Sequence, residues 1–133
     1  SGLSGGAARL ADEDAFSSAR LYQLNPKHGT EPRVVHGMFI GKRPTNPQGV
    51  LDNSVGLGPN TQRRIGYDPA TDEIVIFDRD RDWWDVWDDG DRFMRGGIYH
   101  GHVRAWDQLD SQMKRALIDA GLFDRRGRYL GSQ

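Results

Sequence analysis

A short turn between two strand-like segments constrains the fold of this chain more than any other feature. Residues 68–72 read Asp-Pro-Ala-Thr-Asp, a typical turn composition, and apolar segments flank them at 64–67 and 73–78. This pattern predicts a β-hairpin. A further strand is predicted at 98–106, where the sequence reads Ile-Tyr-His-Gly-His-Val-Arg-Ala-Trp. The C-terminal half of the chain is therefore expected to be built around β-strands.

A helix is predicted directly after the third strand. Asp107 suits the N-cap and Asp110 the first turn, and the helix is expected to run to Ala120 and to end at Gly121. Apolar residues recur along it at helical spacing and give it one apolar face: Leu109, Met113, Ala116, Leu117 and Ala120. Residues 122–130 are expected to form a turn and a last short strand.

The chain of 133 residues has the size of one domain. Residues 1–6 (SGLSGG) read as a linker and residues 7–133 as a single domain. The N-terminal part of this domain, up to residue 60, is predicted to hold a helix at 7–23, a short strand at 34–40 and a long loop at 42–60. The C-terminal part, 61–133, holds the hairpin, the third strand, the helix and the last strand. No apolar run approaches the roughly 18 residues that a membrane span needs.

The charge of the chain is unevenly distributed. The formal net charge is -1, which by itself argues against binding to nucleic acid. Residues 80–91 (DRDWWDVWDDGD) hold six Asp and one Arg, and without them 17 basic and 13 acidic residues give +4. We therefore expect a mildly basic domain that carries one exposed acidic loop. Its Trp83, Trp84 and Trp87 either dock a partner or pack against the sheet.

The third strand carries the residues best suited to chemistry. Strand side chains alternate between faces, so His100, His102, Arg104 and Trp106 share one face, with neighbours about 6.6–6.8 Å apart. Histidine can act as acid or base at neutral pH, and arginine binds phosphate with two hydrogen bonds. Two imidazoles and a guanidinium on this spacing can bracket one phosphodiester, as metal-free RNA cleavage requires. The alternative is a solvated polar face without a function.

A metal site finds less support in the sequence. His-x-His can chelate zinc, but a catalytic zinc usually takes three protein ligands, the chain has no cysteine, and His28 and His36 lie in a different region. The acidic segment does not follow the calcium-loop spacing, since Trp83 and Asp89 occupy the places that need Gly and Glu. We therefore predict no metal and no cofactor.

Four further cations are candidates for the substrate. Lys42 and Arg43 open the long loop, and Arg63 and Arg64 begin a strand that is expected to lie near the His strand. Arg63, Lys42, Arg43 and Trp106 are therefore predicted to bind substrate. Arg64 is predicted to act beside the histidines.

Two segments resemble a known family. Residues 63–78 (RRIGYDPATDEIVIFD) and 99–130 (YHGHVRAWDQLDSQMKRALIDAGLFDRRGRYL) are similar to the type 17 domain of bacterial polymorphic toxins. The resemblance covers about half of the chain. It implies an α+β fold of the barnase/EndoU/colicin/RelE kind, with an N-terminal helical part packed on a small curved antiparallel β-sheet. It carries over His100, His102, Arg104 and Arg64 as active-site residues. The acidic insertion between the Phe-Asp and His-Gly-His strands departs from the family pattern.

The resemblance also implies a function. Members are expected to be metal-independent endoribonucleases, here with tRNA as the expected substrate, at the C-terminus of large secreted or contact-dependent toxins. They act in the cytoplasm of a competing bacterium, and a cognate immunity protein protects the producer. Two alternatives stay open: an ADP-ribosyltransferase that uses NAD, and a non-enzymatic binding module whose active surface is the acidic Trp-rich segment.

Overall fold

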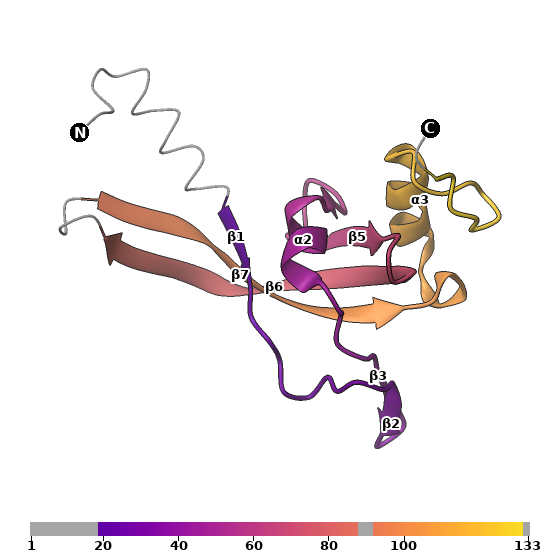
Figure 1. Ribbon diagram of the computed structural model, residues 1–133, viewed down its shortest axis with the longest axis horizontal. Helices are drawn as coiled ribbons and strands as arrows, with labels where there is room; N and C mark the ends of the chain where they lie inside the picture. Colours follow the sequence, from indigo (N-terminus) through magenta and orange to yellow (C-terminus); the bar gives the residue numbers. More distant parts are fainter. Residues whose placement is uncertain (1–18, 88–91, 132–133) are drawn as a thin grey trace.

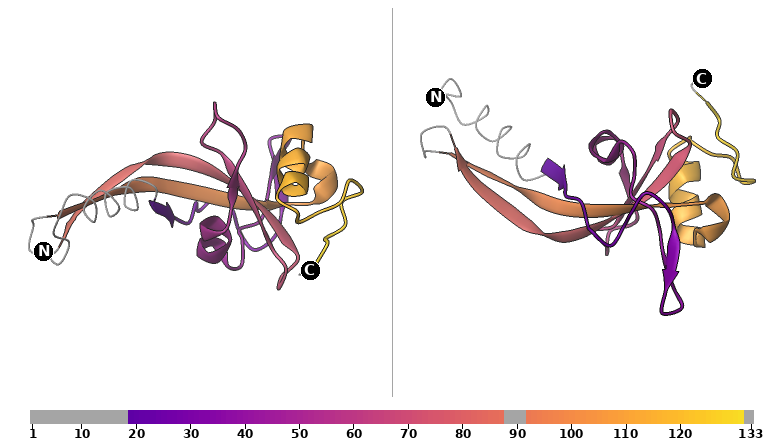
Figure 2. Two further views of the ribbon diagram at one scale, coloured as in Figure 1. Left: turned by 90° about the horizontal axis from the view of Figure 1, so that it is seen from above. Right: turned by 60° about the horizontal axis from the view of Figure 1, so that its bottom comes forward.

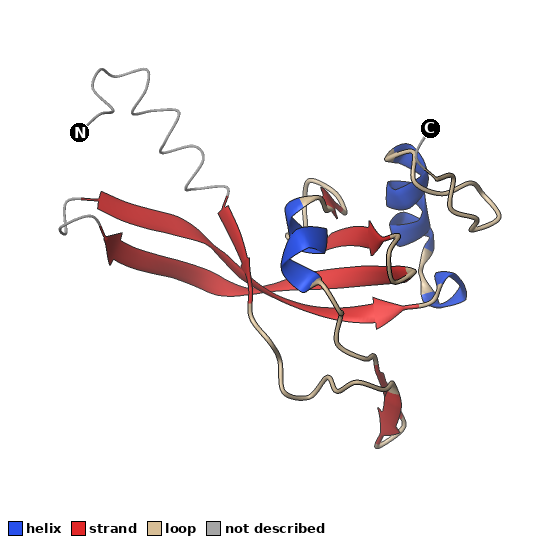
Figure 3. Ribbon diagram, viewed as in Figure 1, coloured by secondary structure: helices blue, strands red, loops and turns tan. Residues whose placement is uncertain are grey.

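A five-stranded mixed sheet forms the centre of the computed structural model (Figures 1 and 3). The structure describes residues 19–87 and 92–131, and it describes their side chains except those of residues 81–96. The strand order is β1-β7-β6-β5-β4. The strands are β1 (Ala19–Tyr22), β4 (Val55–Gly56), β5 (Arg64–Asp68), β6 (Glu73–Trp87) and β7 (Arg92–Arg104). Neighbours from β4 to β7 are antiparallel, whereas β1 runs parallel to β7. The fold is α+β, but the sheet is mixed and not purely antiparallel.

The predicted hairpin is confirmed. β5 and β6 pair around the turn with Ile65 opposite Ile76 and Tyr67 opposite Ile74. The predicted third strand lies within β7. It begins earlier than expected, at Arg92, and ends at Arg104, two residues before Trp106.

The acidic segment is mostly strand, so the prediction of a loop was wrong. β6 continues to Trp87 and pairs with the first half of β7, as in the pairs Trp83–Gly96 and Val86–Phe93. Trp and Val favour strands, and a partner strand alongside the segment satisfies its backbone groups. The β6–β7 hairpin extends far from the rest of the molecule (Figures 1 and 2). Residues 88–91 lie outside the described residues.

The N-terminal helix was also predicted wrongly where it can be compared. Residues 7–18 of that prediction lie outside the described residues, while Ala19–Tyr22 is strand β1. β1 pairs with residues 96–99 of β7. The Tyr22 side chain packs against an apolar cluster that includes Val75, Phe77 and Tyr99. This tertiary pairing outweighs a weak local helix propensity. The described residues contain no N-terminal helical part.

The segment 34–40 was predicted as one strand and is a hairpin. β2 (Arg33–Val35) pairs with β3 (Met38–Ile40). Between them His36 and Gly37 have φ of 51° and 77°. Positive φ at two successive residues is the geometry of a tight hairpin turn, which Gly accommodates easily.

The long loop predicted at 42–60 contains regular structure. Helix α2 (Pro47–Asp52) and strand β4 interrupt it. Pro47 stands at the start of α2, where its missing N–H costs nothing, and Val50 and Leu51 are buried on the sheet.

The C-terminal helix begins later than predicted. A 3-10 turn, η1 (Trp106–Gln108), comes first, followed by α3 (Ser111–Asp119). Asp110, and not Asp107, is the N-cap of α3, because its carboxylate accepts the backbone N–H of Met113 at 2.8 Å. In place of the predicted last strand there is one isolated bridge between Phe123 and Tyr129.

The described side chains form two apolar clusters, one on each face of the sheet. On one face, α3 covers Ile65, Ile74 and Ile76. On the other, α2 covers Val75, Phe77 and Tyr99. Gly101 lies against this second cluster, where a Cβ would stand 2.9 Å from the Phe77 ring, so the Gly of the His-Gly-His segment makes room for packing. Among the described residues no helix is long and apolar enough to cross a membrane.

Candidate active site

Strand β7 places three of the predicted residues on the face that α3 covers. Arg104 lies opposite Ile74, His102 opposite Ile76 and His100 opposite Asp78. Arg104 and His102 lie beside Ile74 and Ile76 of the apolar cluster under α3, whereas His100 lies beyond it. The loop after β1 contacts the row at His100 and the β2–β3 hairpin contacts it at Arg104 (Figure 1). The face therefore changes from core to polar site along a single strand.

His102 is buried and bonded to its neighbour on the row. It is 9% exposed, and its Nε2 accepts a hydrogen bond from Nε of Arg104 at 3.0 Å. Burial, and then the nearby Arg104 charge, lower the pKa of His102 to about 4. The imidazole is therefore neutral at pH 7.

His28 belongs to the same cluster, which the sequence analysis missed. Its ring stacks on that of His102 with centroids 5.2 Å apart and planes 17° apart. Its Nδ1 donates to the carbonyl oxygen of Gly41 at 2.6 Å. Burial lowers the pKa of His28 as well. No local pattern pointed to this contact, because His28 and His102 are 74 positions apart (102 − 28).

His100 has different surroundings. Its Nδ1 donates to the carbonyl oxygen of Gln23 at 2.7 Å, which fixes the ring. Its Nε2 lies 3.5 Å from a carboxylate oxygen of Asp80, and the side chain keeps 22% of its exposure. Of the two β7 imidazoles it is therefore the one with a reachable nitrogen beside a negative charge.

An ion pair and an aromatic ring complete the cluster. Arg63 Nε lies 2.7 Å from Asp78 Oδ1, next to His100 in the sheet. The Arg104 guanidinium lies 5.8 Å from the centre of the Phe39 ring. Two guanidinium groups thus flank the row of histidines, and such groups bind phosphate readily.

This chain is similar to a solved structure of a contact-dependent inhibition (CDI) complex. It is the "Crystal structure of CDI complex from Cupriavidus taiwanensis LMG 19424", with 42% sequence identity and a TM-score of 0.52 over 65% of this chain and 99% of that chain. The chain belongs to the family of this contact-dependent inhibition complex component. No family model matches the chain, and no curated protein matches it. Because the relative is part of a complex, the contact-dependent inhibition family implies a partner chain.

In this family member, Arg64 does not join the cluster. It stands opposite Phe77 on the face that α2 covers. Its Nε and Nη2 donate to the hydroxyl and the carbonyl oxygen of Ser54, both at 2.7 Å. The sequence analysis assigned both Arg63 and Arg64 to the site. Because side chains of neighbouring residues in a strand alternate, the two lie on opposite faces of the sheet.

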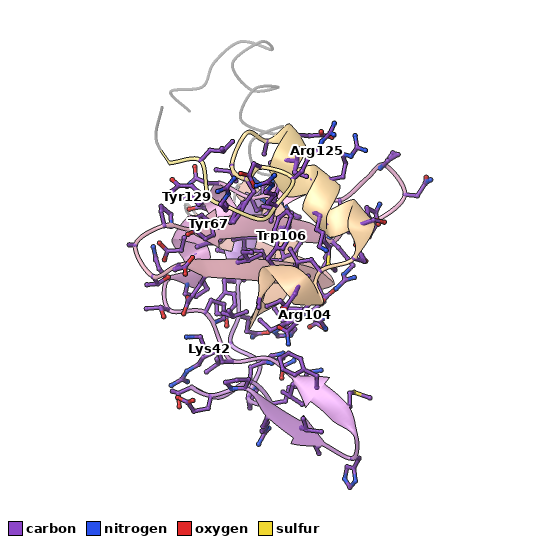
Figure 4. The ribbon with its side chains drawn as sticks, turned by 90° about the vertical axis from the view of Figure 1, so that its right-hand side faces the viewer. Lys42, Tyr67, Arg104, Trp106, Arg125 and Tyr129 are labelled. Carbon is purple, nitrogen blue, oxygen red and sulfur yellow. The ribbon has the colours of Figure 1, made fainter. Side chains whose placement is uncertain are left out.

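Of the other predicted substrate-binding residues, Lys42 and Trp106 have partners outside the His row (Figure 4), and Arg43 is exposed. Lys42 Nζ pairs with Glu73 Oε2 at 2.8 Å, and Glu73 is buried. The backbone N–H of Arg43 donates to the Gly29 carbonyl at 2.7 Å. Burial raises the pKa of Tyr22, and the nearby Arg43 charge offsets part of this rise. Trp106 stacks on Phe123 with ring centres 5.3 Å apart, beside the apolar cluster.

Metal-binding side chains do not gather in the described part of the chain. No three of its His, Cys, Asp or Glu residues are placed to share one ion. The groups that the described site offers for chemistry are imidazole, guanidinium and carboxylate.

Proposed function

We propose that this chain is the toxin of a contact-dependent inhibition pair and cleaves RNA at the His100–Arg104 row. The observation that carries the proposal is the juxtaposition of a reachable imidazole with a guanidinium on one sheet face. An immunity protein needs only a surface that fits its toxin. A row of titratable and cationic groups supported by buried contacts fits an enzyme better.

The site contains the groups that metal-free RNA cleavage requires. His100 Nε2 takes the proton of the ribose 2′-OH, and the 2′-oxygen then bonds to phosphorus. The bond from phosphorus to the 5′-oxygen breaks, and this oxygen takes a proton from water. The hydroxide that remains takes the proton back from the His100 imidazolium, which restores the neutral ring. Arg104 stabilises the charge of the pentacoordinate phosphorus, and the carboxylate of Asp80 stabilises the imidazolium of His100. The products are a 2′,3′-cyclic phosphate and a 5′-hydroxyl.

The biological setting that we propose rests on the similarity to the contact-dependent inhibition complex and on the family resemblance of the sequence. We place the domain at the end of a larger secreted or cell-surface toxin that acts in the cytoplasm of a target bacterium. Its substrate is RNA, with tRNA as the expected class. Its partner is a cognate immunity protein.

Incubation of the purified protein with total tRNA in excess EDTA tests this function. We expect discrete fragments that end in 2′,3′-cyclic phosphate. His100→Ala should cut the rate about 10²–10⁴-fold. His36→Asn is the matched control, because His36 lies exposed in the β2–β3 turn at a φ that Asn tolerates. Intact RNA after incubation with the wild-type protein would refute the proposal.

Replacing Arg104 by lysine tests the guanidinium. Lysine keeps the charge but loses the planar fork and the Nε donor that bonds His102. We expect a rate well below wild type for Arg104→Lys. A rate equal to wild type would remove Arg104 from the mechanism.

The ADP-ribosyltransferase alternative has weaker support. That chemistry needs a glutamate beside the arginine, and Glu73 is instead buried and bonded to Lys42 and Thr45. Glu31 is exposed in the segment that leads to β2. Intact tRNA together with release of nicotinamide from NAD would favour this alternative.

A further inference from the structure

We infer that His28 and His102 form a stacked support that aims the Arg104 guanidinium, so that His102 is a positioning residue and His100 alone exchanges protons. The inference rests on the ribonuclease function proposed above. It assigns different roles to two histidines that the sequence presents as equivalent.

The bond between His102 and Arg104 determines the protonation of the imidazole. A guanidinium nitrogen only donates, so His102 Nε2 must be the acceptor and carries no proton. The proton of the neutral ring is then on Nδ1. The nitrogen that would collect a substrate proton is already occupied by Arg104, 3.0 Å away. His102 therefore cannot act as a base unless it releases Arg104.

His28 and Gly41 enclose the His102 ring. The Nδ1 of His28 is anchored to the Gly41 carbonyl, and the His28 ring lies over that of His102. Gly41 itself approaches so closely that a Cβ there would stand 3.1 Å from His102 Cδ2 and 2.6 Å from the Val103 carbonyl oxygen. The backbone N–H of Val103 donates to the Lys42 carbonyl at 2.9 Å and holds this segment against β7. The imidazole is thus fixed by its neighbours.

The charges around His102 favour a neutral ring. The cations that face it are Arg104 and Arg63, His28 lies above it, and Asp78 is the carboxylate that opposes them. A neutral imidazole with a free lone pair is a good acceptor for a guanidinium. Arg104 is fixed by His102 at Nε and by the Phe39 ring at 5.8 Å. Its Nη1 makes one long hydrogen bond to the Gln108 carbonyl oxygen at 3.5 Å, which leaves Nη2 for phosphate.

Two substitutions at His102 separate positioning from proton transfer. Glutamine can place an amide oxygen near the position of Nε2 and accept from Arg104, but it does not titrate. Leucine fills a similar volume and accepts nothing. We expect His102→Gln to cleave RNA within about tenfold of wild type, and His102→Leu to lose about 10–100-fold, the cost of a lost hydrogen bond to a charged group. If His102 transferred the proton, both variants would lose about 10²–10⁴-fold alike.

His28 is tested by a double-mutant cycle with His102. If His28 acts through the His102 ring, His28→Ala should reduce cleavage in the wild-type background and much less in the His102→Leu background. Equal losses in the two backgrounds would overturn the role of His28. His36→Asn again serves as the control and should leave the cleavage rate unchanged in both backgrounds.

A measurement on the wild-type protein does not depend on activity. In ¹⁵N spectra of the imidazole rings, we expect His102 to be the tautomer with the proton on Nδ1 and to stay neutral from about pH 8 to about pH 5, whereas an unperturbed histidine titrates in this range. A His102 ring that is protonated on Nε2, or that titrates near pH 6.5, would overturn the inference. Failure of the wild-type protein to cleave any RNA would instead refute the proposed function and leave this assignment of the ring intact.

Discussion

Histidines two positions apart on β7 differ because their rings meet different atoms. His102 is enclosed by His28, Arg104 and the Gly41 backbone, whereas His100 faces Asp80 and keeps part of its exposure. A buried imidazole is easier to keep neutral, since burial penalises its charged form. This difference has consequences for stability as well as for catalysis.

We predict that acid weakens the fold through His102. Its pKa is about 4 in the folded chain, against the ordinary histidine value of 6.5 in the unfolded chain. Between these values the unfolded state binds more protons, so the free energy of unfolding falls as the pH falls from about 6.5 to about 4. The total loss is about 3 kcal/mol. Urea titrations over this range measure it.

His102→Gln is the variant that isolates this contribution. Its stability should depend less on pH between 6.5 and about 4 than that of the wild type. His28 shifts in the same direction and contributes to what remains. Parallel curves for the wild type and His102→Gln would contradict the assignment, and His36→Asn should follow the wild type.

Lys42 is a second residue for which the structure changes the expected phenotype. Although burial alone would raise the pKa of Glu73, hydrogen bonds from Lys42 and Thr45 hold it below its usual value. Lys42→Met would leave a buried carboxylate with only its two Thr45 bonds, at a cost of about 3 kcal/mol in unfolding free energy. We expect no separate loss of RNA affinity in the folded variant.

Chemical denaturation checks this prediction. The double variant Lys42→Met/Glu73→Gln should recover part of the lost stability, because the uncompensated charge is gone. Lys27→Met, at an exposed position, is the matched control and should be neutral within about 0.5 kcal/mol. A Lys42→Met protein as stable as wild type would mean that the pair with Glu73 contributes nothing.

Among the helices and strands, the start of α3 offers the sharpest comparison. Asp110 caps it through the Met113 N–H, whereas Asp107 lies inside the η1 turn. We therefore predict that Asp110→Ala lowers the free energy of unfolding by about 1 kcal/mol. Asp107→Ala should change it by less than about 0.5 kcal/mol. Thermal and urea unfolding of the two variants compare them directly, and the reverse order would contradict the cap assignment.

The β6–β7 hairpin shows why the acidic segment was misread. Its Asp residues suggested a solvated loop, yet the two strands pair along it to the Trp87–Arg92 pair. Its first carboxylate, Asp80, lies beside His100 and so does not project away from the site. Asp82 pairs with Gly97, which is three residues, or about 10 Å, from His100. The far end of the hairpin is more distant, since Arg92 is eight residues, or about 26 Å, from His100. That distance exceeds the roughly 8 Å over which salt screens charge.

For the molecule as a whole, we predict that the distal hairpin can be removed without loss of the proposed nuclease activity. The variant replaces residues 83–96 by Asn-Gly, so that the Asp82–Gly97 pair closes a two-residue turn. The described members of both apolar clusters and the His100–Arg104 row lie outside the deleted residues. We therefore expect a folded protein that still cleaves RNA, with weaker binding to its immunity partner, because charged and aromatic residues suit a docking surface.

Circular dichroism, the tRNA assay and calorimetric titration with the immunity protein test these three expectations. An unfolded variant would show that side chains of the deleted segment belong to the core. Unchanged affinity for the partner would remove the docking role. Loss of cleavage in a folded variant would place the segment in the active site.

The elements that could be predicted from the sequence depend on neighbours along the chain. The β5–β6 hairpin follows from turn residues between two apolar runs, and the apolar face of α3 follows from helical spacing. The membership of His100, His102 and Arg104 in one face follows from strand alternation, which needs no tertiary information. These features are local, and short-range sterics and hydrogen bonding specify them.

The remaining features depend on contacts between distant segments. β1 is a strand because it pairs with β7, and the His100 ring is fixed by Gln23, 77 positions away in the chain. Arg64 and Lys42 are withdrawn from the site by Ser54 and Glu73, and His28 enters it from a loop with no motif of its own. Such contacts form only when the sheet brings the segments together, and burial then sets which imidazole can be charged. A local pattern therefore shows which side chains share a face, while packing decides which of them are buried and which meet solvent.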